Sequence, residues 1–289
     1  MNGVKVWMQA VRPRTLLVTL SPVAIGIVIS LSWGVFDMFT FLLTLMTGLS
    51  IQIGANLAND YFDFKKGVDT AARKGPQRVM QAGLVTPSAM KRALFITFSI
   101  TALGGTLLAI ETGPLVLLLA LVAILFAILY SGGPYPLASL GLADIFAFIT
   151  FGPLATFFTY YLQTHIFSLD ALLAGIGPGA FSWAILTVNN LRDIDEDRDA
   201  DKRTLCVRFG RAFGKAMYVT ALALAVLIPF VWIESRPFLP LASLTLFLAL
   251  PLAVQIIKNE KAADLNPLFQ KTAQLLLVYT FLFSIGWML

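Results

Sequence analysis

Two short segments of the chain combine asparagine and aspartate in a pattern that could hold a metal ion. The first is NLANDYFDFKKGVD, residues 56–69, which comes at the end of a long apolar run. At roughly 100° per residue of an α-helix, Asn56, Asp60 and Asp63 fall within about 60° of one another. The segment therefore predicts a stripe of oxygen ligands at the end of an otherwise apolar helix.

The second segment, NNLRDIDEDRDADKRTL at residues 189–205, repeats this pattern after another apolar run. Its Asn189, Asp193 and Asp197 are spaced by four and share a helix face within about 80°. Loop aspartates are usually only solvated. Here, however, the Asn-x-x-x-Asp pattern recurs at the ends of two different helices with like charges three or four residues apart, a spacing that is unfavourable unless a cation neutralises it.

Carboxylate and amide oxygens are ligands for hard cations, and Mg²⁺ is commonly bound by one or two carboxylates together with substrate phosphate oxygens. Basic side chains suited to phosphate accompany both segments. Carboxylates, a metal ion and basic side chains together predict a diphosphate-binding site at the end of the molecule that carries the two segments. The candidate diphosphate-binding residues are Lys65, Arg73, Arg78, Lys202 and Arg203.

The elements that must position these residues are transmembrane helices. The chain has 289 residues, of which 58% are hydrophobic and only 13% are charged. A soluble domain carries about 25% charged residues, so this chain lacks the polar surface that water requires. The single Cys206 and single His165 exclude a cysteine zinc site and a histidine cluster. The composition predicts an all-α integral membrane protein that binds a lipid bilayer and no nucleic acid.

The apolar runs predict a bundle of nine transmembrane helices in a single domain, residues 1–289. Twenty of the 21 lysines and arginines then fall on one side, and only Arg236 falls on the other. By the positive-inside rule the N-terminus is cytoplasmic and the C-terminus is outside. Two long cytoplasmic segments, residues 59–90 and 191–213, are expected to cap the site. The predicted helices lie near 15–33, 38–58, 91–110, 113–131, 141–162, 170–190, 214–233, 238–257 and 271–289.

These features resemble the UbiA superfamily of membrane prenyltransferases, whose members carry two aspartate-rich motifs at the ends of helices 2 and 6. The resemblance is strongest to the 1,4-dihydroxy-2-naphthoate polyprenyltransferase (MenA-type) branch, which has the longer spacing from Asp63 to Asp69. It is carried by RPRTL (12–16), ANDYFDFKKGVDT (58–70), GPQRVMQAGLV (75–85), YSGGPYPLASLGLADIFAFITFGPLAT (130–156) and NNLRDIDEDRDADKRTL (189–205).

The resemblance implies a Mg²⁺-dependent transfer of a polyprenyl group from its diphosphate to 1,4-dihydroxy-2-naphthoate, giving demethylmenaquinone for menaquinone biosynthesis. It implies that Asp60, Asp63, Asp193 and Asp197 are catalytic and hold two Mg²⁺ ions with help from Asn56 and Asn189. It also implies a UbiA-like bundle in the cytoplasmic membrane of a prokaryote, with the site facing the cytoplasm. Further candidate site residues are Asn59, Asp69, Tyr130, Tyr135, Asp144 and Asn190.

Two alternatives stay open. The same fold could prenylate another acceptor, namely 4-hydroxybenzoate, homogentisate, a chlorophyllide or a glycerol ether lipid. An ion-coupled transporter is the alternative from another class, but its charges would lie near the middle of the membrane. Here the carboxylates gather at the ends of the apolar runs, which disfavours a transporter. The sequence leaves the prenyl chain length and the oligomeric state open.

Overall fold

The structure is a computed structural model that describes residues 3–67, 75–259 and 261–289. Two candidate site residues, Asp69 and Arg73, lie outside these ranges. A helix is present at each of the nine predicted positions. The helices are α1 (Gly3–Val11), α2 (Pro13–Ser32), α3 (Met38–Lys66), α4 (Pro87–Thr112), α5 (Pro114–Leu129), α6 (Ala143–Ile149), α7 (Ala155–Thr164), α8 (Leu169–Ala174), α9 (Ile176–Arg192), α10 (Ile194–Asp199), α11 (Leu205–Leu227), α12 (Leu246–Lys258) and α13 (Ala262–Met288).

Short π-helical and 3-10 segments extend several of these α-helices into longer helical rods. A π-helical turn joins α6 to α7, and 3-10 turns follow α11 and precede α12. These segments are η1 (Leu137–Ser139), η2 (Thr150–Leu154), η3 (Ile228–Trp232) and η4 (Leu239–Thr245). Eight of the resulting rods within the described residues are long and apolar enough to cross a bilayer, and α5 is a shorter apolar helix of 16 residues. The count of nine spans therefore stays a prediction, since about 20 residues are needed to cross the hydrocarbon core.

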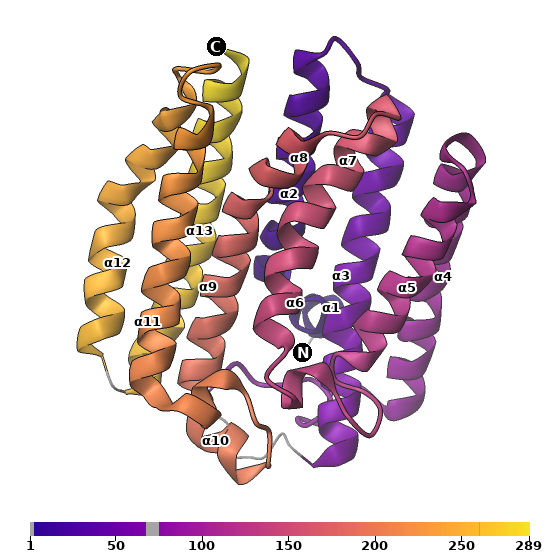
Figure 1. The fold of residues 1–289 in the computed structure, drawn as a ribbon. Helices are drawn as coiled ribbons and strands as arrows, with labels where there is room; N and C mark the ends of the chain where they lie inside the picture. Colours follow the sequence, from indigo (N-terminus) through magenta and orange to yellow (C-terminus); the bar gives the residue numbers. More distant parts are fainter. Residues whose placement is uncertain (1–2, 68–74, 260) are drawn as a thin grey trace.

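The helices form one bundle whose long axes run between two ends (Figure 1). Helices α3, α4 and α5 form one flank, α11, α12 and α13 form the other, and α9 lies between them beside the α6–α7 rod. The short helix α10 lies at the lower end in this view, whereas α13 finishes at the upper end. The N- and C-terminal halves thus meet along the middle of the bundle.

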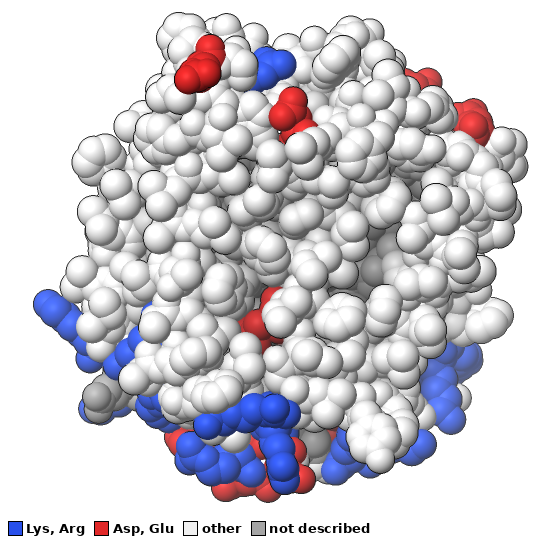
Figure 2. All heavy atoms as spheres, in the orientation of Figure 1, with Lys and Arg blue, Asp and Glu red and all other residues white. Residues whose placement is uncertain are grey.

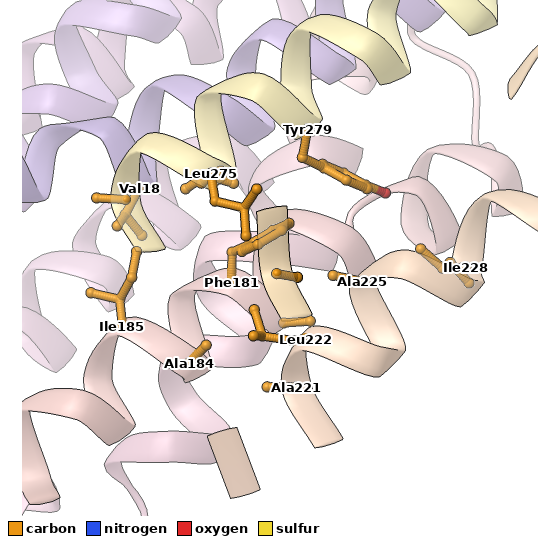
Figure 3. Packing of buried hydrophobic residues seen from close by; sticks show 14 of the residues in the cluster. Val18, Phe181, Ala184, Ile185, Ala221, Leu222, Ala225, Ile228, Leu275 and Tyr279 are labelled. Atoms are coloured by element: carbon orange, nitrogen blue, oxygen red, sulfur yellow. The ribbon is translucent and has the colours of Figure 1, made fainter. Parts of the chain in front are cut away.

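The centre of the core is α9, the most deeply buried of the spans. Its Phe181, Ala184 and Ile185 pack against α11 and α13 (Figure 3). Its other side approaches the π-helical turn so closely that a Cβ added to Gly152 would lie 2.5 Å from the Cα of Gly179. Only glycine permits this backbone approach. The close packing fixes α9, and with it the second aspartate segment, relative to the neighbouring helices.

Charged side chains are concentrated at the end of the bundle that contains α10. On the face shown in Figure 2, most lysines and arginines gather there with several acidic side chains among them, and the flank above is almost uncharged. Arg236 lies at the opposite end, where its guanidinium stacks on the Trp287 ring at 4.3 Å. A broad apolar flank between two polar ends is what an integral membrane protein presents to lipid.

Candidate active site

Residues 56–66 of the first aspartate segment form the last three turns of α3, which continues beyond the predicted helix end at residue 58. The helix ends where Gly67 takes a left-handed φ of 68° and donates its N–H to the carbonyl oxygen of Asp63. The extra turns carry the predicted stripe on one continuous helix. The three predicted ligands of this stripe are all buried, with exposed fractions of 6% for Asn56, 2% for Asp60 and 7% for Asp63.

Asp60 has an unusual environment for a buried carboxylate. Its Oδ2 accepts a hydrogen bond, 3.3 Å long, from the backbone N–H of Val79. Its Oδ1 is fully buried and has no hydrogen-bond partner among the described residues. A buried carboxylate oxygen without a donor costs free energy, and a bound cation would remove that cost. The geometry therefore suits a metal ligand better than a structural carboxylate.

Asn56 lies one turn before Asp60 and ties α3 to the start of α2. Its amide nitrogen donates to the carbonyl oxygen of Val11 and to the Thr15 hydroxyl, both at 2.9 Å. These two bonds use both amide hydrogens, which fixes the orientation of the side chain. Only the carbonyl oxygen of Asn56 is then available to a metal ion.

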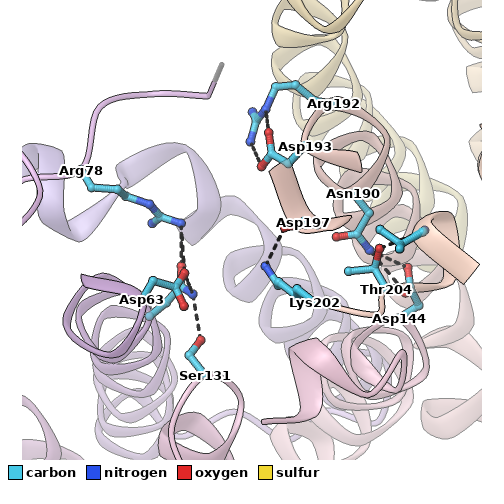
Figure 4. Close-up of polar contacts among 12 residues, drawn as sticks. Asp63, Arg78, Ser131, Asp144, Asn190, Arg192, Asp193, Asp197, Lys202 and Thr204 are labelled. Carbon is cyan, nitrogen blue, oxygen red and sulfur yellow. Dashed lines mark hydrogen bonds and ion pairs between the residues drawn. The ribbon is translucent and has the colours of Figure 1, made fainter. Parts of the chain in front are cut away.

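Asn59 connects several of the polar groups at this end of the bundle. Its carbonyl oxygen accepts hydrogen bonds from Arg12 at 3.1 Å and Arg78 at 2.8 Å. Its amide nitrogen donates to Asp63 and to Ser131, each at 2.8 Å. Figure 4 shows Arg78 and Ser131 on either side of Asp63, and the Arg78 guanidinium lies 3.9 Å from that carboxylate. This network gathers cations around the first segment, where a diphosphate would need them.

The second segment begins at the end of α9. Asp193 terminates that helix and forms a bidentate ion pair with Arg192, with N–O distances of 2.6 and 2.7 Å. A further nitrogen of Arg192 donates to Asn266 of α13 at 3.2 Å. Arg192 is 5% exposed, so the structure assigns a buried partner to Asp193 that the sequence analysis did not select.

Asp197 on α10 pairs with Lys202 at 3.3 Å, and both are directed toward the interior between the two segments (Figure 4). Burial raises the pKa of Asp197 to about 6, against the opposing effect of the Lys202 ammonium. Burial alone would lower the pKa of Lys202, but the carboxylates of Asp197 and Asp63 outweigh it and hold that pKa above its usual value. A buried lysine held in the charged form is suited to binding an anion.

Tyr130 and the Asp144–Asn190 pair lie next to these charges. Burial raises the pKa of Tyr130 to about 12, and its hydroxyl is close enough to Lys202 and Asp144 for both charges to act on it. Asp144, at the start of α6, is 2% exposed, and the Asn190 amide lies 3.4 and 3.5 Å from its two oxygens. The structure therefore brings these three candidates together beside the second segment.

The other candidate residues within the described ranges lie farther from this cluster or have weaker contacts. Lys65 is exposed at the end of α3, Tyr135 is 76% exposed, and Asn189 is half-buried. Arg203 is exposed and pairs with Asp201 at 3.1 Å. Their roles as ligands stay predictions.

The network contains three residues that were not predicted from the sequence: Arg192, Ser131 and Lys66. Lys66 donates to the carbonyl oxygen of Ser131 at 2.8 Å and so joins α3 to the turn after α5. The signal for Arg192 was available, because an arginine directly before an aspartate at the end of an apolar span is costly to bury without a partner. Ser131 gave no signal, since a serine in a glycine-rich turn is common.

The donor set fits magnesium. In the part of the chain that the structure describes, no three Asp, Glu, His or Cys side chains are grouped closely enough to form a complete metal site. Each segment instead offers one or two carboxylates, with asparagine oxygens beside them. Mg²⁺ is usually held by so few protein ligands, the remainder being water and substrate phosphate. Residues from both segments would hold the ion together with a diphosphate.

Comparison with known proteins identifies several relatives. The model of the UbiA prenyltransferase family matches residues 19–285. A 1,4-dihydroxy-2-naphthoate octaprenyltransferase of Escherichia coli (strain K12) is 33% identical over 290 residues, covering 97% of this chain and 94% of its own. The protein of the same description from Mycobacterium tuberculosis (strain ATCC 25618 / H37Rv) is 33% identical over 273 residues, covering 94% of this chain and 93% of its own.

A solved structure shows the same fold. A UbiA homolog from Archaeoglobus fulgidus, bound to DMAPP and Mg²⁺, superposes with a TM-score of 0.68 at 14% sequence identity. The match covers 97% of this chain and 99% of the homolog. At 14% sequence identity, the match shows a shared fold and nothing more.

Proposed function

The chain belongs to the UbiA prenyltransferase family, whose enzymes transfer prenyl groups, and from this we propose that it transfers a polyprenyl group from its diphosphate to 1,4-dihydroxy-2-naphthoate. The names of the relatives from E. coli and M. tuberculosis, each matched over more than nine-tenths of this chain, support this acceptor. Loss of the ring carboxylate as CO₂ would leave the ring as a hydroquinone, so the direct product would be demethylmenaquinol, the reduced form of the menaquinone precursor demethylmenaquinone.

The observation that carries the proposal is the buried Asp60 carboxylate, whose Oδ1 has no partner among the described residues, at the basic end of an apolar bundle. Asp60 and Asp63 from α3, with Asp193 and Asp197 from the second segment, would hold two Mg²⁺ ions, and Asn56 and Asn189 would assist. When bound, Mg²⁺ neutralises the negative charge that develops on the departing diphosphate. The Mg²⁺ and DMAPP bound to the A. fulgidus homolog support this role.

The chain's own residues contribute in three ways. Lys202 and Arg78 place positive charge beside the two segments and so favour diphosphate binding and departure. The buried surroundings of Asp60 and Asp197 exclude water, which would otherwise capture the allylic cation. The long apolar flank of the bundle gives the prenyl tail an environment that matches it.

We also propose that the basic end faces the cytoplasm, with the N-terminus on that side and the C-terminus outside. The concentration of lysine and arginine at the end that contains α10 supports this orientation through the positive-inside rule. The protein would then act in the cytoplasmic membrane of a prokaryote and take its aromatic acceptor from the cytoplasm.

An acceptor panel tests the proposed reaction. Purified protein is given one prenyl diphosphate, Mg²⁺ and, in separate reactions, 1,4-dihydroxy-2-naphthoate, 4-hydroxybenzoate or homogentisate, and products are measured by mass spectrometry. We expect product with the naphthoate, and its mass should show that the ring carboxylate has been replaced by the prenyl group. Product from 4-hydroxybenzoate with none from the naphthoate would contradict the proposed acceptor.

A further inference from the structure

A row of polar and aromatic side chains follows the contact between α6 and α9, next to the candidate metal site but separate from its proposed ligands. Asp144 and Asn190 meet at the charged end of this contact. One turn farther along α6 and about two turns back along α9, the rings of Phe148 and Trp183 meet edge to face, with centroids 6.4 Å apart. The row therefore leads from the charged end into the bundle.

Two groups in this row have hydrogen-bonding capacity that the described residues do not use. A carboxylate can accept about four hydrogen bonds, but the only side-chain donor to Asp144 among the described residues is the Asn190 amide, whose distances of 3.4 and 3.5 Å are long for a hydrogen bond. The indole N–H of Trp183 is buried and has no partner among the described residues. Buried polar groups are normally satisfied, so a ligand that donated to the Asp144 carboxylate and accepted from the Trp183 indole would complete both groups.

The row opens toward the groups that would bind the diphosphate. Figure 4 shows the Asp144–Asn190 pair on one side of Lys202 and Asp197, with Asp63 and Arg78 on the other. A molecule seated along the row would therefore lie next to the groups proposed to bind the diphosphate.

We propose that Asp144, Asn190, Phe148 and Trp183 form the subsite for the aromatic acceptor, in which Asp144 accepts a hydrogen bond from a ring hydroxyl and so orients the ring. This inference rests on the proposed function, because it supplies the second substrate of that reaction. The ligand it fits is a flat ring with at least one hydroxyl donor. The two aromatic side chains offer surfaces for the ring, and the indole N–H offers a donor to a ring oxygen.

The same subsite explains how the ring of the acceptor would be oriented relative to Asp144. A carboxylate accepts hydrogen bonds and repels another carboxylate, so a hydroxylated aromatic acid would place its hydroxyl edge toward Asp144. Its own carboxylate would point toward the cations instead. Asp144 is thus an orienting and specificity-determining residue, distinct in role from the metal ligands Asp60 and Asp197.

Two variants test the subsite. Asp144→Asn keeps the size of the side chain, and Trp183→Phe keeps a ring against Phe148 while removing the N–H. Two acceptors are compared, 1,4-dihydroxy-2-naphthoate and its mono-O-methyl ether. The Kd of each acceptor is measured by calorimetry and its KM by product formation. The Kd of dimethylallyl diphosphate is measured separately in the presence of Mg²⁺. We expect Asp144→Asn to weaken acceptor binding about tenfold or more, since it replaces a charge-assisted hydrogen bond with at best a neutral one and places an NH2 donor where an acceptor oxygen was. The Kd of dimethylallyl diphosphate for this variant should stay within about twofold of the wild-type value. The variant should also discriminate less than wild type between 1,4-dihydroxy-2-naphthoate and its mono-O-methyl ether.

Tyr279→Phe is the matched control. Tyr279 is also fully buried, and its hydroxyl also lacks a partner among the described residues, but it belongs to α13 and packs on Phe181 on another face of α9. Removing that hydroxyl should leave both substrate affinities unchanged. An equal loss of acceptor and diphosphate binding in Asp144→Asn would indicate a structural role and overturn the inference.

The outcomes separate the inference from the proposed function. If wild-type protein prenylates the naphthoate but Asp144→Asn retains its acceptor Kd and KM, the subsite is wrong and the function stands. If wild-type protein binds the naphthoate through Asp144 without transferring a prenyl group to it, the subsite stands and the function is wrong. If wild-type protein binds no hydroxylated aromatic compound in the calorimeter, the subsite is overturned.

Discussion

Replacing Asp60 with alanine should reduce the rate of prenyl transfer by about a hundredfold or more while the protein stays folded in detergent. The loss follows because a proposed metal ligand disappears. Folding should be retained because, among the described residues, Asp60 accepts hydrogen bonds only from the backbone N–H groups of Val79 and Met80, and its Oδ1 has no partner. Transfer is measured as product formed per enzyme, and folding as the thermal unfolding midpoint without Mg²⁺.

Asp37→Asn provides the control at the other end of the same helix. Asp37 caps the N-terminus of α3 by accepting the N–H of Thr40 at 2.6 Å, and asparagine can make the same cap. This variant removes a carboxylate from α3 without touching the site, so its transfer rate should match wild type. Full activity in Asp60→Ala would exclude Asp60 as a ligand, and loss of activity in both variants would show that the assay reports damage to α3.

Replacing Arg192 with leucine should destabilise the protein by about 3 kcal/mol when no metal is bound. Arg192 and Asp193 form a bidentate pair whose side chains are only 6% and 14% exposed. The substitution removes both of these hydrogen bonds from a carboxylate that is largely shielded from water, and it also removes the bond to Asn266. The free energy of unfolding in detergent, measured without Mg²⁺, reports the effect.

Arg203→Leu is the comparison for this variant. Arg203 also pairs with a nearby aspartate, at 3.1 Å from Asp201, but these two side chains are 67% and 84% exposed. Exposed ion pairs contribute at most about 1 kcal/mol, so this variant should remain close to wild type. Similar small losses in both variants would contradict the structural role assigned to Arg192.

Most of the helical architecture could be predicted from the sequence because apolar runs of membrane length leave few alternatives. A helix lies at each predicted position, and eight of the rods meet the length and hydropathy expected of a span. The end of α3 was placed too early, at residue 58, because the following residues are polar. Lys65 and Lys66 in the last turn and Gly67 after it are the local signals for the true end.

The site was predictable in its residue types and only partly in its contacts. The spacing of Asn56, Asp60 and Asp63 indicated a shared helix face, and all three are buried on α3. The partners of Asn59 could not be predicted, because they come from the junction between α1 and α2, from α3, from the segment before α4 and from the turn after α5. Such contacts depend on how distant helices pack, and no periodicity along one helix contains that information.

The central claim is that the two aspartate segments form one Mg²⁺-dependent diphosphate site. The most direct test is equilibrium binding of dimethylallyl diphosphate to wild-type protein, Asp60→Ala and Asp197→Ala, each with Mg²⁺ and with a chelator in its place. We predict binding by the wild type only when Mg²⁺ is present, and a loss of that binding in both variants, since each removes a carboxylate from a different segment. Binding that survives the chelator, or that persists unchanged in either variant, would contradict the account.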